Sequence, residues 1–154
     1  MRVSKIMRKN TLKSSTIKNS SRLMEQEQDK KEIKNGQGSM TWPDGSSYEG
    51  GFVNDMLDGH GILNWSDGTT YNGEYEENLR SGFGTICAPF NGGSYEGQWS
   101  KDMKHGQGTE FYENGDSFKG SFEHDEPNQG IVTYSDGHEE TGKWHEGIWY
   151  TINH

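Results

Sequence analysis

The sequence has little of what a thick globular core or a disulfide-stabilised domain requires. It contains one cysteine, Cys87, and three prolines among 154 residues, and only 27% of its residues are hydrophobic. A single cysteine excludes an internal disulfide and indicates a reducing compartment. No long apolar run is present, so we expect neither a secretory signal nor a membrane-spanning segment.

Glycine and aromatic residues are abundant by contrast. The chain has 22 glycines, and aromatic residues make up 12% of it. Disordered chains are poor in aromatic residues. We therefore expect an ordered chain that is held together by something other than a conventional core.

Charge is divided unevenly along the chain. Residues 1–35 carry ten Lys/Arg and four Asp/Glu, a net charge of +6, whereas residues 36–154 carry five and twenty, a net charge of −15. Phosphate backbones and anionic lipid headgroups repel so acidic a body, so we expect no nucleic-acid partner and membrane contact only through the basic segment. The basic side chains that could lie on an acidic surface are Arg2, Lys5, Arg8, Lys9, Lys13, Lys18 and Arg22.

The first 21 residues also resemble a mitochondrial presequence, because they are basic, rich in Ser and Thr, and free of acid. Lys outnumbers Arg there, however, and the apolar residues form no clear stripe. A cytoplasmic location is the prediction that these features favour. Residues 22–34 contain good helix formers, so a short helix is expected within the basic extension.

A sequence unit of about 23 residues recurs through the rest of the chain. We divide it into a basic extension (1–35), a half unit (36–47), four full units (48–70, 71–94, 95–117 and 118–139), a second half unit (140–150) and a tail (151–154). Such regular recurrence predicts a single repeat domain over residues 36–150.

Each unit has the pattern of two β-strands. Tyr95, Gly97 and Trp99 alternate with polar residues, which places them on one face of an extended strand. Asp-Gly or Asn-Gly then precedes the next unit and favours a hairpin turn. We expect strands near 71–75 and 82–86, with the rings of Tyr71 and Tyr75 lying over the bare backbone of glycines such as Gly82 and Gly84.

The third unit shows a family resemblance most clearly. Its residues Tyr95-Glu96-Gly97-Gln98-Trp99, followed by His105-Gly106-Gln107-Gly108, closely resemble the MORN motif. The resemblance implies an all-β fold, namely an elongated, single-layer antiparallel sheet of stacked hairpins that is solenoid-like. It also implies a non-catalytic scaffold, because members of this family occur in ciliary radial spokes, cytoskeletal and cell-division structures and membrane junctions, and as modules fused to enzymes whose catalytic domains lie elsewhere.

Two units depart from the motif. Cys87-Ala88-Pro89-Phe90-Asn91-Gly92-Gly93 replaces the end of the second unit, and Asn128-Gln129 replaces His-Gly in the fourth. Pro89 cannot donate a hydrogen bond to a neighbouring strand, so we expect a bulge in that hairpin and a bend of the rod.

Candidate chemistry is sparse. His60 and His105 occupy the same position two units apart, which separates them by roughly 19 Å, too far to share an ion. The remaining histidines have no ligand spacing, and Cys87 has no evident base, so a small packed residue is the better interpretation of it. The sequence predicts no catalytic residue, no metal site and no cofactor.

Candidate partner-binding residues are aromatic or apolar. One group consists of two aromatic residues in the first expected strand of each full unit, and it fits either a structural core or an open binding groove. Its members are Tyr48, Phe52, Tyr71, Tyr75, Tyr95, Trp99, Phe118 and Phe122. A second group, Trp144, Ile148, Trp149 and Tyr150, lies where the last unit lacks a clear second strand. We expect that end to be an open edge and the main contact for a partner, and the charged segment 30–34 to blunt the other end.

The leading functional hypothesis is a structural scaffold or adaptor in a cytoskeletal assembly, with the axoneme or radial spoke of a cilium as the preferred setting. A peripheral membrane tether that recognises acidic phospholipids is the first alternative. A regulatory subunit of an enzyme is the second.

Overall fold

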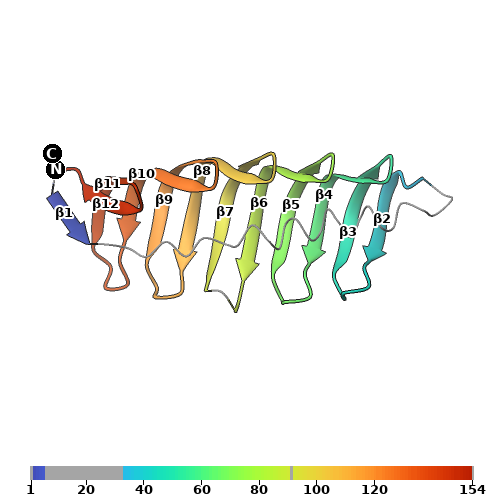
Figure 1. Ribbon diagram of the computed structural model, residues 1–154, viewed down its shortest axis with the longest axis horizontal. Helices are drawn as coiled ribbons and strands as arrows, with labels where there is room; N and C mark the ends of the chain where they lie inside the picture. The colour runs from blue at the N-terminus through green and yellow to red at the C-terminus, as the bar shows by residue number, and fades with distance from the viewer. Residues whose placement is uncertain (1, 6–32, 91, 154) are drawn as a thin grey trace.

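The computed structural model describes residues 2–5, 33–90 and 92–153, and these form one twelve-stranded antiparallel sheet. The strand order is β1-β12-β11-β10-β9-β8-β7-β6-β5-β4-β3-β2, so eleven strands follow each other in sequence and β1 is added beyond the last of them. The sheet is a long ribbon of side-by-side hairpins (Figure 1), which confirms the predicted fold class. The predicted helix over residues 22–34 falls almost wholly outside the described residues.

The strand bounds match the repeat. They are β1 (Arg2–Lys5), β2 (Gly36–Thr41), β3 (Ser47–Val53), β4 (Met56–Asn64), β5 (Thr70–Glu76), β6 (Leu79–Ala88), β7 (Gly93–Ser100), β8 (Met103–Tyr112), β9 (Ser117–Glu123), β10 (Glu126–Thr133), β11 (Glu139–His145) and β12 (Ile148–Thr151). The predicted strands near 71–75 and 82–86 are β5 and the middle of β6.

The Asp-Gly and Asn-Gly sequences form turns along one long edge of the ribbon. Their glycines, Gly45, Gly68, Gly115 and Gly137, all have positive φ. In the first of these turns the Gly45 amide donates to the Trp42 carbonyl at 3.0 Å. Glycine adopts this backbone conformation at little cost, which is why the sequence signal was reliable here.

The opposite edge carries the turn within each unit, which the sequence analysis expected between the two strands without giving its length or type. Asn54-Asp55, Glu77-Asn78, Lys101-Asp102 and His124-Asp125 each have positive φ at both residues, and so do Glu146 and Gly147. Two consecutive residues with positive φ define a type I′ turn, whose twist suits a hairpin. Four of the five turns contain no glycine, so the usual glycine signal is absent.

Each full hairpin also bends at one point. The pairing register shifts between Gly50 and Phe52 in β3–β4 and between Gly97 and Trp99 in β7–β8, and equivalent shifts occur in β5–β6 and β9–β10. An extra residue on one strand bends a hairpin. The upper parts of the hairpins accordingly fold over in Figure 1.

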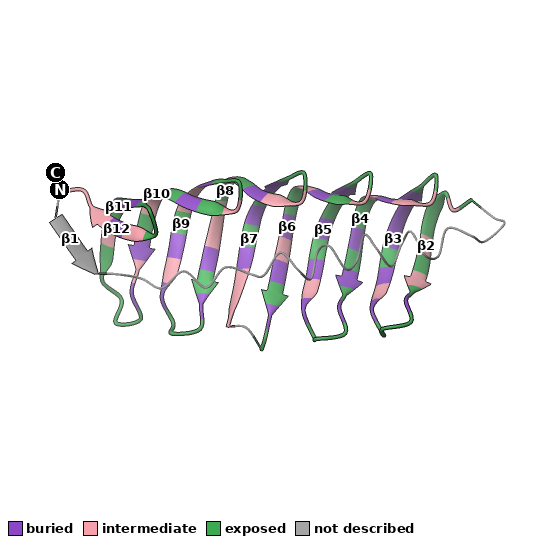
Figure 2. Cartoon of the chain, viewed as in Figure 1, coloured by how far each residue is buried: buried purple, intermediate pink, exposed green. Residues whose placement is uncertain are grey.

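Aromatic rings fill the inside of this bend and replace a conventional core. They make a continuous series of edge-to-face contacts along the rod, with ring centroids 4.9–5.9 Å apart: Phe52–Tyr48, Tyr48–Tyr75, Tyr75–Tyr71, Tyr71–Trp99, Trp99–Tyr95, Tyr95–Phe122, Phe122–Phe118 and Phe118–Trp149. Such pairs contribute about 0.5–1.5 kcal/mol each beyond their burial. The buried positions alternate with exposed ones along the strands (Figure 2).

The predicted packing of rings on glycine is confirmed for Tyr71 and needs correction for Gly82. A Cβ at Gly73 or Gly84 would lie against the Tyr71 ring. The neighbour of Gly82 is the Glu74 side chain instead, and Gly82 has a φ of +57°. Gly82 therefore serves the backbone bend, and the side chain beside it is Glu74 and not an aromatic ring.

Two expectations about irregular points are wrong. Pro89 lies beyond the last pair of β6 and β7, Ala88 with Gly93, and the pairing of these strands has no register shift. Because Pro89 is outside the ladder, it causes no bulge.

The second error concerns the C-terminal end, which is a complete hairpin. Strand β12 pairs with β11, and β1 pairs with β12 through Arg2 with Thr151 and Val3 with Tyr150.

Candidate interaction surfaces

Two cations lie buried between the aromatic rings. The Arg80 guanidinium carbon is 4.1 Å from the centroid of Trp99, and Lys104 Nζ is 5.2 Å from that of Tyr95. Both side chains are less than 5% exposed. A cation over an electron-rich ring face is attracted to it, so these residues complete the aromatic core.

Each buried cation has a carboxylate partner. Arg80 Nε donates to Asp102 Oδ1 at 2.8 Å, and Lys104 Nζ is 2.5 Å from Glu110 Oε1. Glu110 stands in β8 at the position that Leu63 and Ile86 occupy in earlier units. One unit has thus replaced an apolar core residue with half of an ion pair.

A repeated hydrogen-bond pair joins neighbouring units at the two-residue turns. The Asp102 carboxylate accepts from the Arg80 amide at 3.0 Å, and the Asp102 amide donates back to the Arg80 carbonyl at 3.0 Å. We call this reciprocal pair the turn clamp. It recurs between Asp55 and Lys34, Asn78 and Leu57, and Asp125 and Lys104.

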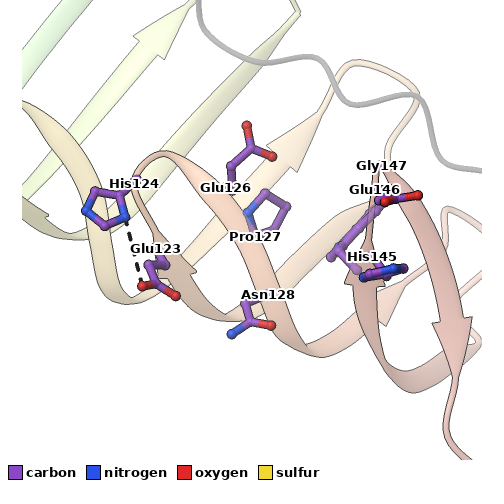
Figure 3. A pocket seen from close by; sticks show the side chains of 9 residues that line it. Glu123, His124, Glu126, Pro127, Asn128, His145, Glu146 and Gly147 are labelled. Carbon is purple, nitrogen blue, oxygen red and sulfur yellow. Dashed lines mark ion pairs between the residues drawn. The ribbon is translucent and has the colours of Figure 1, made fainter.

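The clamp is missing at the last junction. Pro127 stands where Arg80 and Lys104 stand and has no amide hydrogen, and Gly147 stands where Asp102 and Asp125 stand and has no side chain. A cavity of about 430 Å³ lies there, between the β9–β10 turn and the β11–β12 turn. Figure 3 shows side chains of both turns around it, among them Glu123, Glu126 and Glu146.

The face of the sheet opposite the rings exposes several large apolar side chains. The second strand of each full unit has one that is 39–54% exposed, namely Ile62, Phe83, Phe111 and Ile131, and Val53 and Leu79 beside the two-residue turns are 45% and 36% exposed. We call this side the outer face. Polar residues flank two of these side chains in register: Glu49 and Asn72 lie beside Ile62, and Ser94 and Ser117 lie beside Phe111.

Basic side chains are scarce on the outer face. Lys119 and Lys143 lie there toward the C-terminal end, while Arg80 and Lys104 are buried. The carboxylates of Glu49, Glu74 and Glu96 are exposed. The greater part of this face therefore carries negative charge.

The sequence-predicted partner-binding rings lie in the core. Tyr48, Phe52, Tyr71, Tyr75, Tyr95, Trp99, Phe118 and Phe122 are all exposed by 5% or less. They leave no open aromatic groove. In this conformation the rings form a structural core and not a binding groove. Trp144 and Trp149 are also buried, at 8% and 0%, while Ile148 and Tyr150 are half-buried.

The basic candidates lie at or beyond the described residues. Arg2 and Lys5 are in β1, whose backbone alone is described. Arg8, Lys9, Lys13, Lys18 and Arg22 fall outside the described residues, so their contact with an acidic surface stays a prediction. Most of the segment 30–34 that was expected to blunt the first edge falls outside as well.

The described residues hold no cluster with the composition of a metal centre. No group of three or more His, Cys, Asp and Glu side chains within them is arranged so that it could hold a metal ion. Cys87 is exposed on the outer face and not packed, contrary to expectation, because Tyr71, Ile86 and their neighbours occupy the inner positions. Burial raises the pKa of Tyr48 to about 12 and raises the pKa values of Tyr71, Tyr75, Tyr95 and Tyr112 as well, so these hydroxyls stay protonated at alkaline pH values at which an exposed tyrosine ionises.

A comparison with protein-family models decides the family. The MORN repeat model matches residues 33–47, 48–70, 71–89 and 95–117, slightly more than half of the chain. The chain belongs to the MORN-repeat family. No curated protein matches it at a comparable level of significance.

MORN repeats are non-catalytic modules that mediate interactions with proteins or membranes. The described part of this MORN protein contains no helix that is long and apolar enough to cross a membrane. The interaction surfaces to consider are therefore the outer face, the cavity at the missing clamp and the outer edge of β2, which no described strand covers.

Proposed function

We propose that this MORN protein is a scaffold that binds partner proteins along its outer face and holds them in a larger assembly. The observation that carries the proposal is the recurrence of an exposed apolar side chain on the second strand of each full unit, at Ile62, Phe83, Phe111 and Ile131. Exposed apolar residues rimmed by polar ones are typical of protein-binding surfaces. They lie on alternate strands of the ribbon, β4, β6, β8 and β10, which suits a partner that extends along the rod.

Charge favours a protein partner over a lipid surface. Anionic membranes attract Lys and Arg, each worth about 1 kcal/mol near the surface. The outer face has acidic residues such as Glu49, Glu74 and Glu96 across most of its length. A membrane-tether role would therefore depend on the basic segment of residues 1–35.

The proposed setting is the cytoplasm, in a cytoskeletal assembly, with the ciliary axoneme or radial spoke as the preferred example. A long rod of stacked hairpins suits a spacer in such an assembly. The basic N-terminal segment, with Arg8, Lys9, Lys13, Lys18 and Arg22, has the charge to lie on an acidic filament surface.

The experiment is co-purification of the full chain from its native source with chemical cross-linking and mass spectrometry. The proposal expects stoichiometric protein partners, cross-linked to residues beside the outer face such as Lys119 and Lys143. Sedimentation with vesicles that contain phosphatidylserine forms the second arm. Recovery of the chain with vesicles and without protein partners would replace the scaffold by a membrane tether, and co-purification with one catalytic chain alone would make it a regulatory subunit.

A further inference from the structure

Strand β8 divides the outer face into two halves that match each other. Thr109 of β8 pairs in register with Glu96 of β7 on one side and with Lys119 of β9 on the other. Phe111, two residues further along β8 and flanked by a serine on each side, is 45% exposed. Glu96 and Lys119 are exposed as well. An apolar centre therefore has opposite charges at equal distances on its two sides.

The same relationship recurs three strands away from β8. Asn72 of β5 and Thr141 of β11 lie in the same cross-strand row as Thr109, each three strands from it. Two residues further along these strands, toward the two-residue turns, are Glu74 and Lys143, both exposed. Side chains two residues apart in a strand share a face. These two charges therefore also stand at the same level, at equal distances from β8.

We propose that two copies of the chain pack outer face against outer face about a twofold axis that runs parallel to β8. Such an axis exchanges the two sides of β8 and preserves the level along the strands. It places β7 of one copy over β9 of the other, and β5 over β11. Glu96 then faces Lys119 of the second copy, and Glu74 faces its Lys143. The symmetry makes each of these pairs occur twice.

Charge selects a second copy as the occupant. A twofold contact requires a surface that is complementary to itself, and a face with one sign of charge would repel its own copy. Lys119 and Lys143 each meet a glutamate here, while the two Phe111 rings meet at the centre. Sheets that pack face to face are about 10 Å apart, which Glu and Lys side chains from opposite sheets can bridge.

The size of the contact indicates its strength. Strands β5 to β11 extend about 34 Å across the ribbon, and the part of each strand before the bend is about 17 Å long. Two such faces bury on the order of 1,200 Å² in total, which is near the lower limit for a specific interface. We therefore expect a reversible dimer whose population depends on concentration.

The inference rests on the proposed use of the outer face and names a second copy as one occupant of it. The two rods run in opposite directions in this dimer, because the axis lies across the length of the ribbon. The dimer is a spacer with two equivalent ends.

Sedimentation equilibrium of the full chain over a range of concentrations tests the proposal, and we expect a monomer–dimer equilibrium. Glu96→Lys or Lys119→Glu alone brings like charges together at two symmetry-related contacts. Each should weaken the dimer about tenfold or more. The double variant E96K/K119E exchanges the charges, restores the attraction and should associate as the parent does. The exchange E74K/K143E repeats this test at the second pair.

Matched controls lie at the edge of the ribbon. Glu77→Lys and Lys101→Glu make the same changes of charge at equivalent positions of two turns and should leave association unchanged. Phe111→Ser gives the central position the residue type of its two neighbours and should weaken the dimer about tenfold or more. Circular dichroism checks the fold of each variant, which these exposed positions should preserve.

A parent chain that stays monomeric at every concentration would overturn the dimer. Single charge variants that associate like the parent would overturn it too, and so would folded exchange variants that associate as weakly as the single ones. Other proteins that still cross-link to a monomeric chain would leave the scaffold function intact. A dimer that recruits no other protein would leave only the dimer standing, so the two proposals fail separately.

Discussion

Lys104 Nζ and Glu110 Oε1 lie 2.5 Å apart on β8, and both side chains are less than 5% exposed. The second Glu110 oxygen accepts from the Tyr112 hydroxyl at 3.0 Å. A buried ion pair depends on both of its members, because either one alone is an uncompensated charge. The third unit is therefore held together differently from its neighbours, which have Ile86 and Val132 in place of Glu110.

Glu110→Ala should destabilise the protein by about 3–5 kcal/mol, because it leaves the Lys104 ammonium buried and unpaired. The double variant K104L/E110L reproduces Leu57 and Leu63 of the first unit and should recover stability to within about 2 kcal/mol of the parent. Urea unfolding followed by circular dichroism measures both. A double variant no more stable than Glu110→Ala would show that the ion pair is not the reason for the loss.

The turn clamps should differ in strength according to charge. Asn78→Ala removes one neutral acceptor from the Leu57 amide and should cost about 1 kcal/mol. Asp102→Ala removes an acceptor at the same position and also leaves the buried Arg80 guanidinium without its carboxylate partner. We therefore expect a loss of about 3–5 kcal/mol in the free energy of unfolding. Equal losses for the two variants in the same unfolding assay would contradict a charge-dependent clamp.

Trp99→Ala should cost about 3 kcal/mol or more, because the ring contacts Tyr71 and Tyr95 and lies under Arg80 in a core only one layer thick. Trp99→Phe keeps a ring and loses the bond to the Gly84 carbonyl, so a smaller loss of about 1–2 kcal/mol is expected. An unchanged unfolding midpoint in the alanine variant would contradict a structural role for the ring.

Stability should fall at alkaline pH. Burial raises the pKa of Tyr48 to about 12 from an ordinary value near 10. Between these values the unfolded chain releases the phenol proton and the folded chain keeps it, so the stabilisation is complete below pH 10 and is lost as pH rises toward 12. Thermal midpoints across this range, with tyrosinate absorbance as the second readout, test the sign. A midpoint that is constant or rises from pH 10 to 12 would contradict it.

The sequence predicts the repeat, the hairpins and the packing of Tyr71 over Gly84, because these features depend on residues within one unit. It does not reveal the turn clamps, although Asp55, Asn78, Asp102 and Asp125 recur with the period of the repeat. Their acceptors act on a backbone amide of the preceding unit, and only the stacking of hairpins brings the two together. Arg80 and Lys104 resemble solvated charges for the same reason.

The C-terminal end shows a second limit of local patterns. The predicted open edge rested on a missing second strand after Trp144, yet Glu146-Gly147 turns the chain into β12 and Trp149 becomes fully buried. A four-residue strand is too short for a clear alternation. The pairing of β12 with β1 joins residues at opposite ends of the chain, which no local signal indicates.

The central claim, that the outer face holds partner proteins, is tested most directly by site-specific photo-cross-linking of the full chain in its native cells. A photoreactive residue at position 83 or 131 replaces an apolar side chain exposed on that face, and position 90, in the β6–β7 loop and 83% exposed, serves as the control. The scaffold account predicts discrete protein adducts from positions 83 and 131, stronger than those from position 90. Lipid adducts alone, or no adducts from positions 83 and 131, would contradict it.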